Sequence, residues 1–164
     1  ASPAKIVNKA VMEAAPQLKV IGRTGVGYDS VDVDAATELG IPVVITPGAN
    51  NRAVAEHSLT LMLALSKNLV EAQVEASKGN WAIRDAHKQF ELYGKKAGII
   101  GLGRIGVNTA KILKAMNVNV IAYDAFQSEA GKAVAEYVEL DELLAKWEEM
   151  GYTFSTLKKL VRNT

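Results

Sequence analysis

Three glycines in the stretch Gly101-Leu102-Gly103-Arg104-Ile105-Gly106 have the spacing of a dinucleotide-binding turn. The first glycine permits a tight turn, the second lets backbone N–H groups reach a pyrophosphate, and the third lets the next helix pack closely on the strand. The amides of Arg104 and Ile105 open that helix, where free N–H groups and the helix dipole favour an anion. We therefore predict that this turn holds the phosphates of a dinucleotide. For the side chain of Arg104, phosphate contact and a solvated surface position remain open alternatives.

An acidic residue, Asp124, follows Gly101 at the distance of about 20 residues that the second part of such a site requires. A carboxylate there accepts hydrogen bonds from the adenosine ribose hydroxyls and repels a 2′-phosphate. The pair of features predicts NAD, rather than NADP, as the cofactor. A structural unit of the same shape without a ligand is the alternative.

The segments around the glycine turn predict the elements that would position it. Residues 97–100 read as a strand, 107–116 as a helix and 118–123 as a second strand, which gives a β-turn-α-β unit. Upstream, we expect a helix at 5–15, a strand at 18–21 that opens into a turn at 22–28, a helix at 31–39 and a strand at 41–45. This alternation is typical of an α/β fold with parallel strands.

One long helix is expected from about residue 53 to residue 78, with Asn50 or Asn51 as its cap and Gly79 at its end. Between residues 59 and 65 it is apolar on nearly every face, so it must be covered on all sides. We predict a homodimer contact through the helix 53–78. Packing within the domain is the alternative.

The remaining segments are less specific. Residues 81–93 are polar and predict an irregular connection. Beyond Asp124 we expect a helix at 128–136, a strand at 137–138 and a helix at 141–150, with Leu143, Leu144, Trp147 and Met150 facing the core. Gly151 would end that helix, and Ser155 would cap a last one that carries Leu157, Leu160 and Val161.

Composition excludes several functional classes. The 164 residues include 19 basic and 18 acidic ones, a net charge of +1, and no long basic run, so nucleic acid is not an expected partner. The sequence has no cysteine, which excludes disulfides and thiol catalysis and fits a reducing compartment such as the cytoplasm. No apolar stretch approaches the roughly 18 residues of a membrane span, so no membrane role is expected.

Several longer stretches carry a family resemblance. Residues 18–29 read LKVIGRTGVGYD, residues 40–50 read GIPVVITPGAN and residues 54–57 read VAEH, followed by the glycine triplet and Asp124. Together they resemble the D-isomer-specific 2-hydroxyacid dehydrogenases, and most closely the members that act on 3-phosphoglycerate. The resemblance implies hydride transfer between a hydroxy acid and NAD. It also implies that residues 1–48 are part of a flavodoxin-like substrate domain, and that residues 49–164 are the linking helix and an incomplete Rossmann-like NAD-binding domain.

The same resemblance assigns a role to the loop at residues 24–27. In the family, the matching loop brings backbone N–H groups to both the cofactor and the substrate carboxylate. This implies that Gly25, Val26 and Gly27 bind substrate and that Val26 also contacts the cofactor. Considered without the resemblance, the loop could simply be a turn that follows a strand.

No catalytic residue is assigned. The arginine, glutamate and histidine of the family lie in motifs beyond the matched region, so we expect the chain to be a fragment or variant that does not turn over NAD alone. We interpret His57, beside Glu56, as a packing or capping residue and His87 as solvated. The alternative function is a non-catalytic nucleotide-sensing or oligomerisation module on the same scaffold. A metal site formed by Asp124, Asp141 and Glu142 is a weaker third option.

Overall fold

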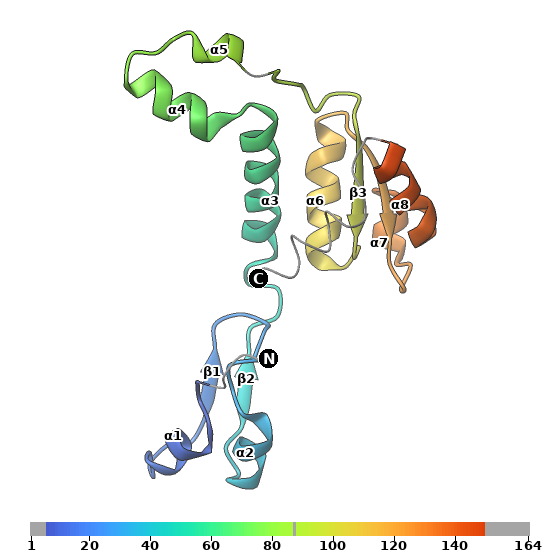
Figure 1. The fold of residues 1–164 in the computed structure, drawn as a ribbon. Coiled ribbons are helices and arrows are strands. Elements are labelled where there is room, and N and C mark those ends of the chain that lie inside the picture. Colours follow the sequence, from blue (N-terminus) through green and yellow to red (C-terminus); the bar gives the residue numbers. More distant parts are fainter. Residues whose placement is uncertain (1–5, 87, 150–164) are drawn as a thin grey trace. The chain divides into compact units, whose positions relative to one another are not determined.

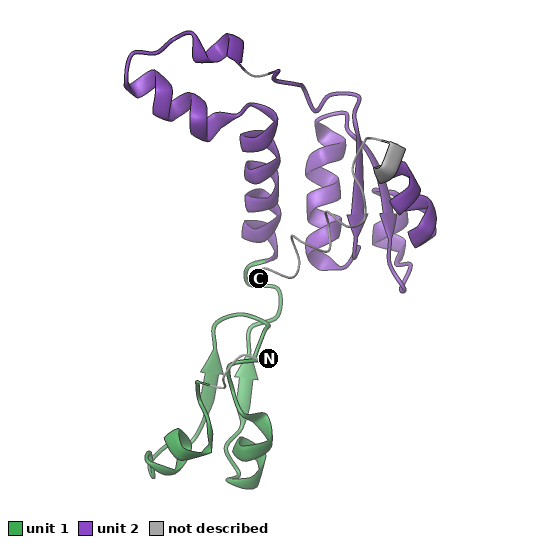
Figure 2. Cartoon of the chain, in the orientation of Figure 1, with its two compact units in different colours: residues 1–50 green, residues 51–164 purple. Residues whose placement is uncertain are grey.

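The computed structural model describes residues 6–86 and 88–149, and the chain divides into two compact units (Figure 1). Unit 1 comprises residues 1–50 and unit 2 residues 51–164 (Figure 2). Each unit contains parallel strands joined by helices, so the predicted α/β class is confirmed. The assignment of the two parts to a substrate domain and a nucleotide domain stays a prediction.

Unit 1 is built on two short parallel strands, β1 (Ile21–Arg23) and β2 (Val43–Ile45). The helix α1 (Lys9–Glu13) precedes β1, and α2 (Val33–Glu38) lies between the two strands in the chain. Parallel neighbours need a crossover, which α2 supplies. The small apolar core of the unit consists of Met12, Val31, Ala35 and Ala36.

The first helix is shorter than the sequence pattern indicates. It begins at Lys9 because the side chain of Asn8 accepts a backbone N–H of the first turn and so caps the helix. Val7 forms a parallel bridge with Val31 instead of joining the helix. The prediction of a helix over residues 5–15 was therefore wrong at residues 6–8 and 14–15, and residue 5 lies outside the described residues.

The strands of unit 1 are also shorter than expected. Pairing sets their bounds, because Ile21 lies opposite Val43 and Arg23 opposite Ile45. The strand predicted at 18–21 is thus displaced toward the loop that follows it, and Leu18 packs against the core without joining the sheet.

Unit 2 contains the predicted β-turn-α-β unit. Strands β3 (Lys96–Ile100) and β4 (Asn119–Tyr123) are joined by α6 (Arg104–Ala115), and all three agree closely with the expected ranges. A short helix α7 (Glu129–Lys132) leads from β4 to β5 (Glu136–Tyr137), and α8 (Leu140–Glu149) follows. In the described part of the chain the strand order is β3-β4-β5, with every pair parallel.

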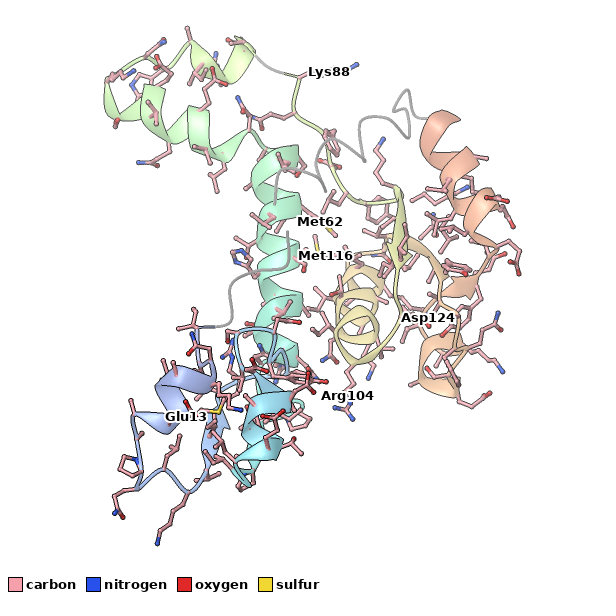
Figure 3. All side chains as sticks on the ribbon, turned by 60° about the horizontal axis from the view of Figure 1, so that its bottom comes forward. Glu13, Met62, Lys88, Arg104, Met116 and Asp124 are labelled. Atoms are coloured by element: carbon pink, nitrogen blue, oxygen red, sulfur yellow. The ribbon has the colours of Figure 1, made fainter. Side chains whose placement is uncertain are left out.

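Helices cover both faces of this sheet. Along β4, Val120 and Ala122 point into a cluster with Ala110 and Leu113 of α6, as alternate positions of a strand must. Residues from α3 (Asn51–Ser66) and the end of α6 also pack on this cluster, among them Leu59, Met62 and Met116 (Figure 3).

The other face of the sheet is covered by α8. Leu143 is buried there, and its side chain lies 3.2 Å from the point where a Cβ of Gly98 would stand. Ile121, which alternates with the residues that face α6, is buried as well. The prediction that Leu143 faces the core is confirmed, whereas the side chains of Trp147 and Met150 lie outside the described residues.

The helix expected over residues 53–78 is two helices. After α3 the backbone of Asn68 adopts a left-handed conformation with φ of 48°, and α4 (Leu69–Ser77) begins next to it. Asparagine tolerates this conformation better than most residues. The N–H of Phe90 donates to the carbonyl oxygen of Ser66 at 3.1 Å. The segment that leads toward β3 thus supplies a donor for a carbonyl group at the end of α3.

The connection from α4 to β3 is irregular as expected, apart from the single turn of α5 (Ile83–Ala86). The helix expected at 128–136 ends at Lys132, because residues 133–135 form a turn that leads into β5. The features expected around Gly151 and Ser155, with the last helix, lie outside the described residues. No helix within those residues is both long enough and apolar enough to cross a bilayer.

Candidate functional site

The glycine turn between β3 and α6 has the backbone geometry that its sequence predicts. Gly101 has φ of +95°, a conformation that side chains disfavour, and its N–H donates to the carbonyl oxygen of Tyr123 at 2.8 Å. At Gly106, a Cβ would overlap the carbonyl oxygen of Gly101. The first and third glycines therefore let the chain turn sharply and bring α6 against the end of β3.

The second glycine leaves the start of α6 open. Gly103 is the N-cap residue, and a Cβ placed there would meet nothing within 4 Å. Within the described part of the chain, no hydrogen-bond partner is recorded for the amides of Gly103, Arg104 and Ile105. These N–H groups lie at the positive end of a helix of 12 residues, a position that favours an anion.

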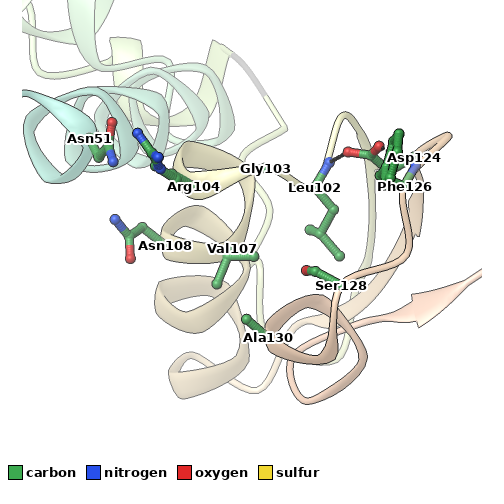
Figure 4. Close-up of a pocket in the computed structure, with 10 residues that line it drawn as sticks. All are labelled: Asn51, Leu102, Gly103, Arg104, Val107, Asn108, Asp124, Phe126, Ser128 and Ala130. Atoms are coloured by element: carbon green, nitrogen blue, oxygen red, sulfur yellow. Dashed lines mark hydrogen bonds between the residues drawn. The ribbon is translucent and has the colours of Figure 1, made fainter. Parts of the chain in front are cut away.

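Asp124 follows β4 and lies against the same turn (Figure 4). Its Oδ2 accepts the N–H of Leu102 at 2.6 Å, and its Oδ1 accepts the N–H of Phe126 at 2.8 Å. These two bonds fix the carboxylate at the tip of the strand. Each carboxylate oxygen can accept more than one hydrogen bond, so the group retains capacity for ligand hydroxyls.

The turn and the acid share one pocket of about 610 Å³, which lies entirely within unit 2 (Figure 4). Its shape is that of an open groove along the N-terminus of α6, with the loop after β4 as its far wall. The residues that line it are Asn51, Leu102, Gly103, Arg104, Val107, Asn108, Asp124, Phe126, Ser128 and Ala130.

Four polar or aromatic members of this pocket were not predicted as site residues. Asn51 opens α3, Asn108 lies on the first turns of α6, and Phe126 and Ser128 belong to the loop after the acid. In the sequence, Asn51 indicates only a helix cap, and Ser128 indicates only the start of a helix. No feature of the sequence indicates that Phe126 lines a pocket.

The predicted substrate loop is described within unit 1. Gly25 has φ of +142°, its N–H donates to Oγ1 of Thr46 at 2.7 Å, and its carbonyl oxygen accepts the N–H of Thr46 at 2.9 Å. The amide of Gly25 is thus engaged within the unit. The amides of Val26 and Gly27 have no hydrogen-bond partner among the described residues. The roles of these three residues toward substrate and cofactor stay predictions.

His57 is not among the residues that line the pocket. His57 lies on α3 and is exposed, which does not fit the packing role expected for it. His87 lies outside the described residues. In the described part of the chain no group of three or more His, Cys, Asp or Glu side chains is arranged to hold a metal ion, so Asp124 is not joined by Asp141 and Glu142.

The curated proteins that this chain matches are named as dehydrogenases and a reductase. D-3-phosphoglycerate dehydrogenase of Archaeoglobus fulgidus is 45% identical over 141 residues, covering 85% of this chain and 27% of the relative. The enzyme of the same name from Methanocaldococcus jannaschii is 49% identical over 120 residues, covering 73% and 23%. Hydroxypyruvate reductase of Thermotoga maritima is 44% identical over 133 residues, covering 81% and 43%. The chain thus spans about a quarter of the phosphoglycerate dehydrogenases that it matches.

Solved structures agree with these relatives. The apo-structure of D-lactate dehydrogenase from Escherichia coli matches with a TM-score of 0.77 and 35% identity, over 84% of this chain and 44% of that one. D-lactate dehydrogenase from Aquifex aeolicus, complexed with NAD and lactic acid, matches with a TM-score of 0.72 and 32% identity, over 85% and 42%. The family model described as "D-isomer specific 2-hydroxyacid dehydrogenase, catalytic domain" matches residues 2–164. With this match over nearly its whole length, the chain belongs to the D-isomer specific 2-hydroxyacid dehydrogenase family.

Proposed function

We propose that the pocket of unit 2 binds the adenosine diphosphate half of NAD. The observation that carries the proposal is the bond from the N–H of Leu102 to Oδ2 of Asp124. This bond holds the acid, which is the proposed ribose contact, against the glycine turn, which is the proposed phosphate contact. The pocket volume of about 610 Å³ is within the range of small-molecule and cofactor sites.

The phosphates are proposed to lie over the N-terminus of α6. The amides of Gly103, Arg104 and Ile105 stand at the start of this helix and would act as the donors, and the absence of a side chain at Gly103 leaves room for close approach. Backbone donors at a helix start are preorganised, so little ordering is required on binding. Arg104 also lines the pocket, and its side chain would add a positive charge near the phosphates.

The ribose is proposed to lie at Asp124. A carboxylate accepts hydrogen bonds from the 2′- and 3′-hydroxyls and cannot donate to a 2′-phosphate. A 2′-phosphate would also bring two negative charges together in a partly desolvated pocket. The chain should therefore prefer NAD to NADP.

The chain is proposed to contribute this site to an NAD-dependent oxidoreductase that acts on the CH–OH group of a D-2-hydroxy acid. Bound nicotinamide supplies the hydride acceptor or donor of such a reaction. Relatives named D-3-phosphoglycerate dehydrogenase support 3-phosphoglycerate as the substrate. The loop of Gly25, Val26 and Gly27 is the proposed contact for the substrate carboxylate, and a cysteine-free sequence supports the cytoplasm as the compartment.

We also propose a homodimer through α3 and α4. Leu61 is 52% exposed and Leu65 is 80% exposed. On α4, the apolar residues Leu69, Val70 and Val74 are exposed as well. Leu59 and Met62 pack on the core of unit 2, so among the described residues the leucines that stay exposed lie on another side of α3. These exposed leucines also favour the second candidate function, a non-catalytic oligomerisation or nucleotide-sensing module.

Isothermal titration of the 164-residue chain tests the nucleotide site. ADP-ribose and NAD should bind with saturation, and NADP should bind at least tenfold more weakly. No saturation with millimolar ADP-ribose would contradict the proposal. Purified chain that reduces NAD in the presence of 3-phosphoglycerate would rule out the non-catalytic alternative.

A further inference from the structure

Tyr137 connects the edge of the sheet to the far wall of the pocket. It lies on β5 opposite Ala122 of β4, and the next residue, Val138, donates its N–H to the carbonyl oxygen of Ala122 at 2.9 Å. The ring packs against the cluster beneath α6. The hydroxyl reaches beyond that cluster and accepts the N–H of Ser128 at 3.3 Å.

The backbone of α7 lies directly on this hydroxyl. A Cβ at Gly131 would overlap the hydroxyl oxygen of Tyr137 and would come within 2.8 Å of Cδ2 of Leu102. The distances from this Cβ position to the hydroxyl oxygen of Tyr137 and to Cδ2 of Leu102 are both shorter than a van der Waals contact. The phenol, the helix and a residue of the glycine turn are therefore packed together without intervening space.

Ser128 links Tyr137 to the pocket, because it bonds to the phenol and also lines the pocket. Its N–H donates to Tyr137, while its own hydroxyl accepts the N–H of Gly131 at 3.1 Å and so caps α7. At the other end of the same loop, Asp124 holds the N–H of Phe126. The loop that forms the far wall is thus fixed at two points, one at the ribose-binding acid and one at the phenol.

We propose that the hydroxyl of Tyr137 is a positioning group for the adenosine end of the pocket. The inference rests on the proposed function of that pocket. Tyr137 is not among the residues that line the pocket, so it would act through Ser128 and through Phe126, a residue that is 88% exposed. Without the hydroxyl, the N–H of Ser128 loses its acceptor, and the wall must be ordered at the moment the adenosine binds.

The substitution Tyr137→Phe tests this, since it removes the hydroxyl and keeps the ring in the core. The Kd for ADP-ribose, measured by isothermal titration on the full chain, should rise three- to tenfold. Tyr93→Phe is the matched control, because Tyr93 is exposed on the connection before β3 and does not line the pocket. Its Kd should stay within twofold of the unmodified chain.

Amide hydrogen exchange separates positioning from a general loss of structure. In Tyr137→Phe, the amide of Ser128 should lose protection, while the amide of Val138, which bonds to β4, should retain it. An unchanged Kd, or equal loss of protection at both amides, would overturn the inference. If the unmodified chain does not bind ADP-ribose, the proposed function fails, and the exchange at Ser128 still decides whether the hydroxyl holds the loop.

Discussion

The substitution Gly106→Ala should separate α6 from the end of β3. A Cβ at this position would overlap the carbonyl oxygen of Gly101 and would lie 3.2 Å from its carbonyl carbon and 3.5 Å from Cγ2 of Ile99. The first two atoms belong to the backbone, which cannot rotate away as the end of a long side chain can. The helix must therefore move off the strand, and the packing beneath it must change.

The cost follows from two opposing terms. Overpacking of a well-filled interior costs about 1–3 kcal/mol, and this overlap belongs at the upper end of that range. Alanine within a helix recovers up to about 1 kcal/mol relative to glycine. We expect a net loss of about 2 kcal/mol, which for a chain of this size lowers Tm by roughly 4–8 °C. Urea unfolding followed by far-UV circular dichroism, with a thermal scan, measures both quantities.

Gly103→Ala is the matched control within the same turn. Its Cβ would meet nothing within 4 Å, and its φ of −73° suits any residue. Stability should change by less than about 1 kcal/mol, while the affinity for ADP-ribose should fall at least tenfold, because the Cβ occupies the approach to the helix amides. Equal unfolding midpoints for Gly106→Ala and the unmodified chain would refute the packing argument, as would equal destabilisation by the two substitutions.

Three further substitutions test other parts of the chain. Asp124→Asn leaves one acceptor oxygen and removes the charge, so ADP-ribose should bind about 10–100-fold more weakly and the preference for NAD over NADP should narrow in isothermal titration; an unchanged preference would contradict the assigned role. Hydrogen bonds from Lys78, then Asn80, hold the pKa of Glu75 below its ordinary value of 4.5, so Lys78→Ala should raise that pKa in an NMR titration. Because the lowered pKa belongs to the folded state, the stabilisation is present above the ordinary pKa and is lost as pH falls through the lowered one; the stability difference between the two chains should then vanish in acid. The double substitution Leu61→Asp and Leu65→Asp changes only exposed positions of α3 and should halve the mass in sedimentation equilibrium; an unchanged mass would count against the dimer.

The glycine turn and its acid were predictable because local backbone physics determines them. The sharp turn at Gly101, the close approach at Gly106 and the strand end at Asp124 are each properties of a few consecutive residues. The sequence therefore indicates them directly, and the structure places them together. Ligand contact by these residues stays a prediction that the titrations test.

Other features depend on residues distant in sequence and were missed. The break at Asn68 lies within a stretch whose sequence pattern predicts one long helix, and Phe90, which bonds at this break, is more than 20 residues away. Whether Val7 joins a helix or a bridge depends on Val31. The wall of the pocket likewise depends on Tyr137, which the sequence marks only as a strand residue. Each of these outcomes depends on a contact with a residue distant in the sequence, and the periodicity of a segment carries no information about such contacts.

Every strand pair among the described residues of the two units is parallel, which affects how the chain acquires its structure. Ile21 must meet Val43, and Lys96 must meet Asn119, with a helix between the partners in each case. No pair can form as a local hairpin, so each requires closure of a long loop before any ladder bond forms. Such topologies reach the native state more slowly than hairpin-based ones. On a ribosome, β3 would emerge and wait with its edge unpaired until α6 and β4 had also been synthesised.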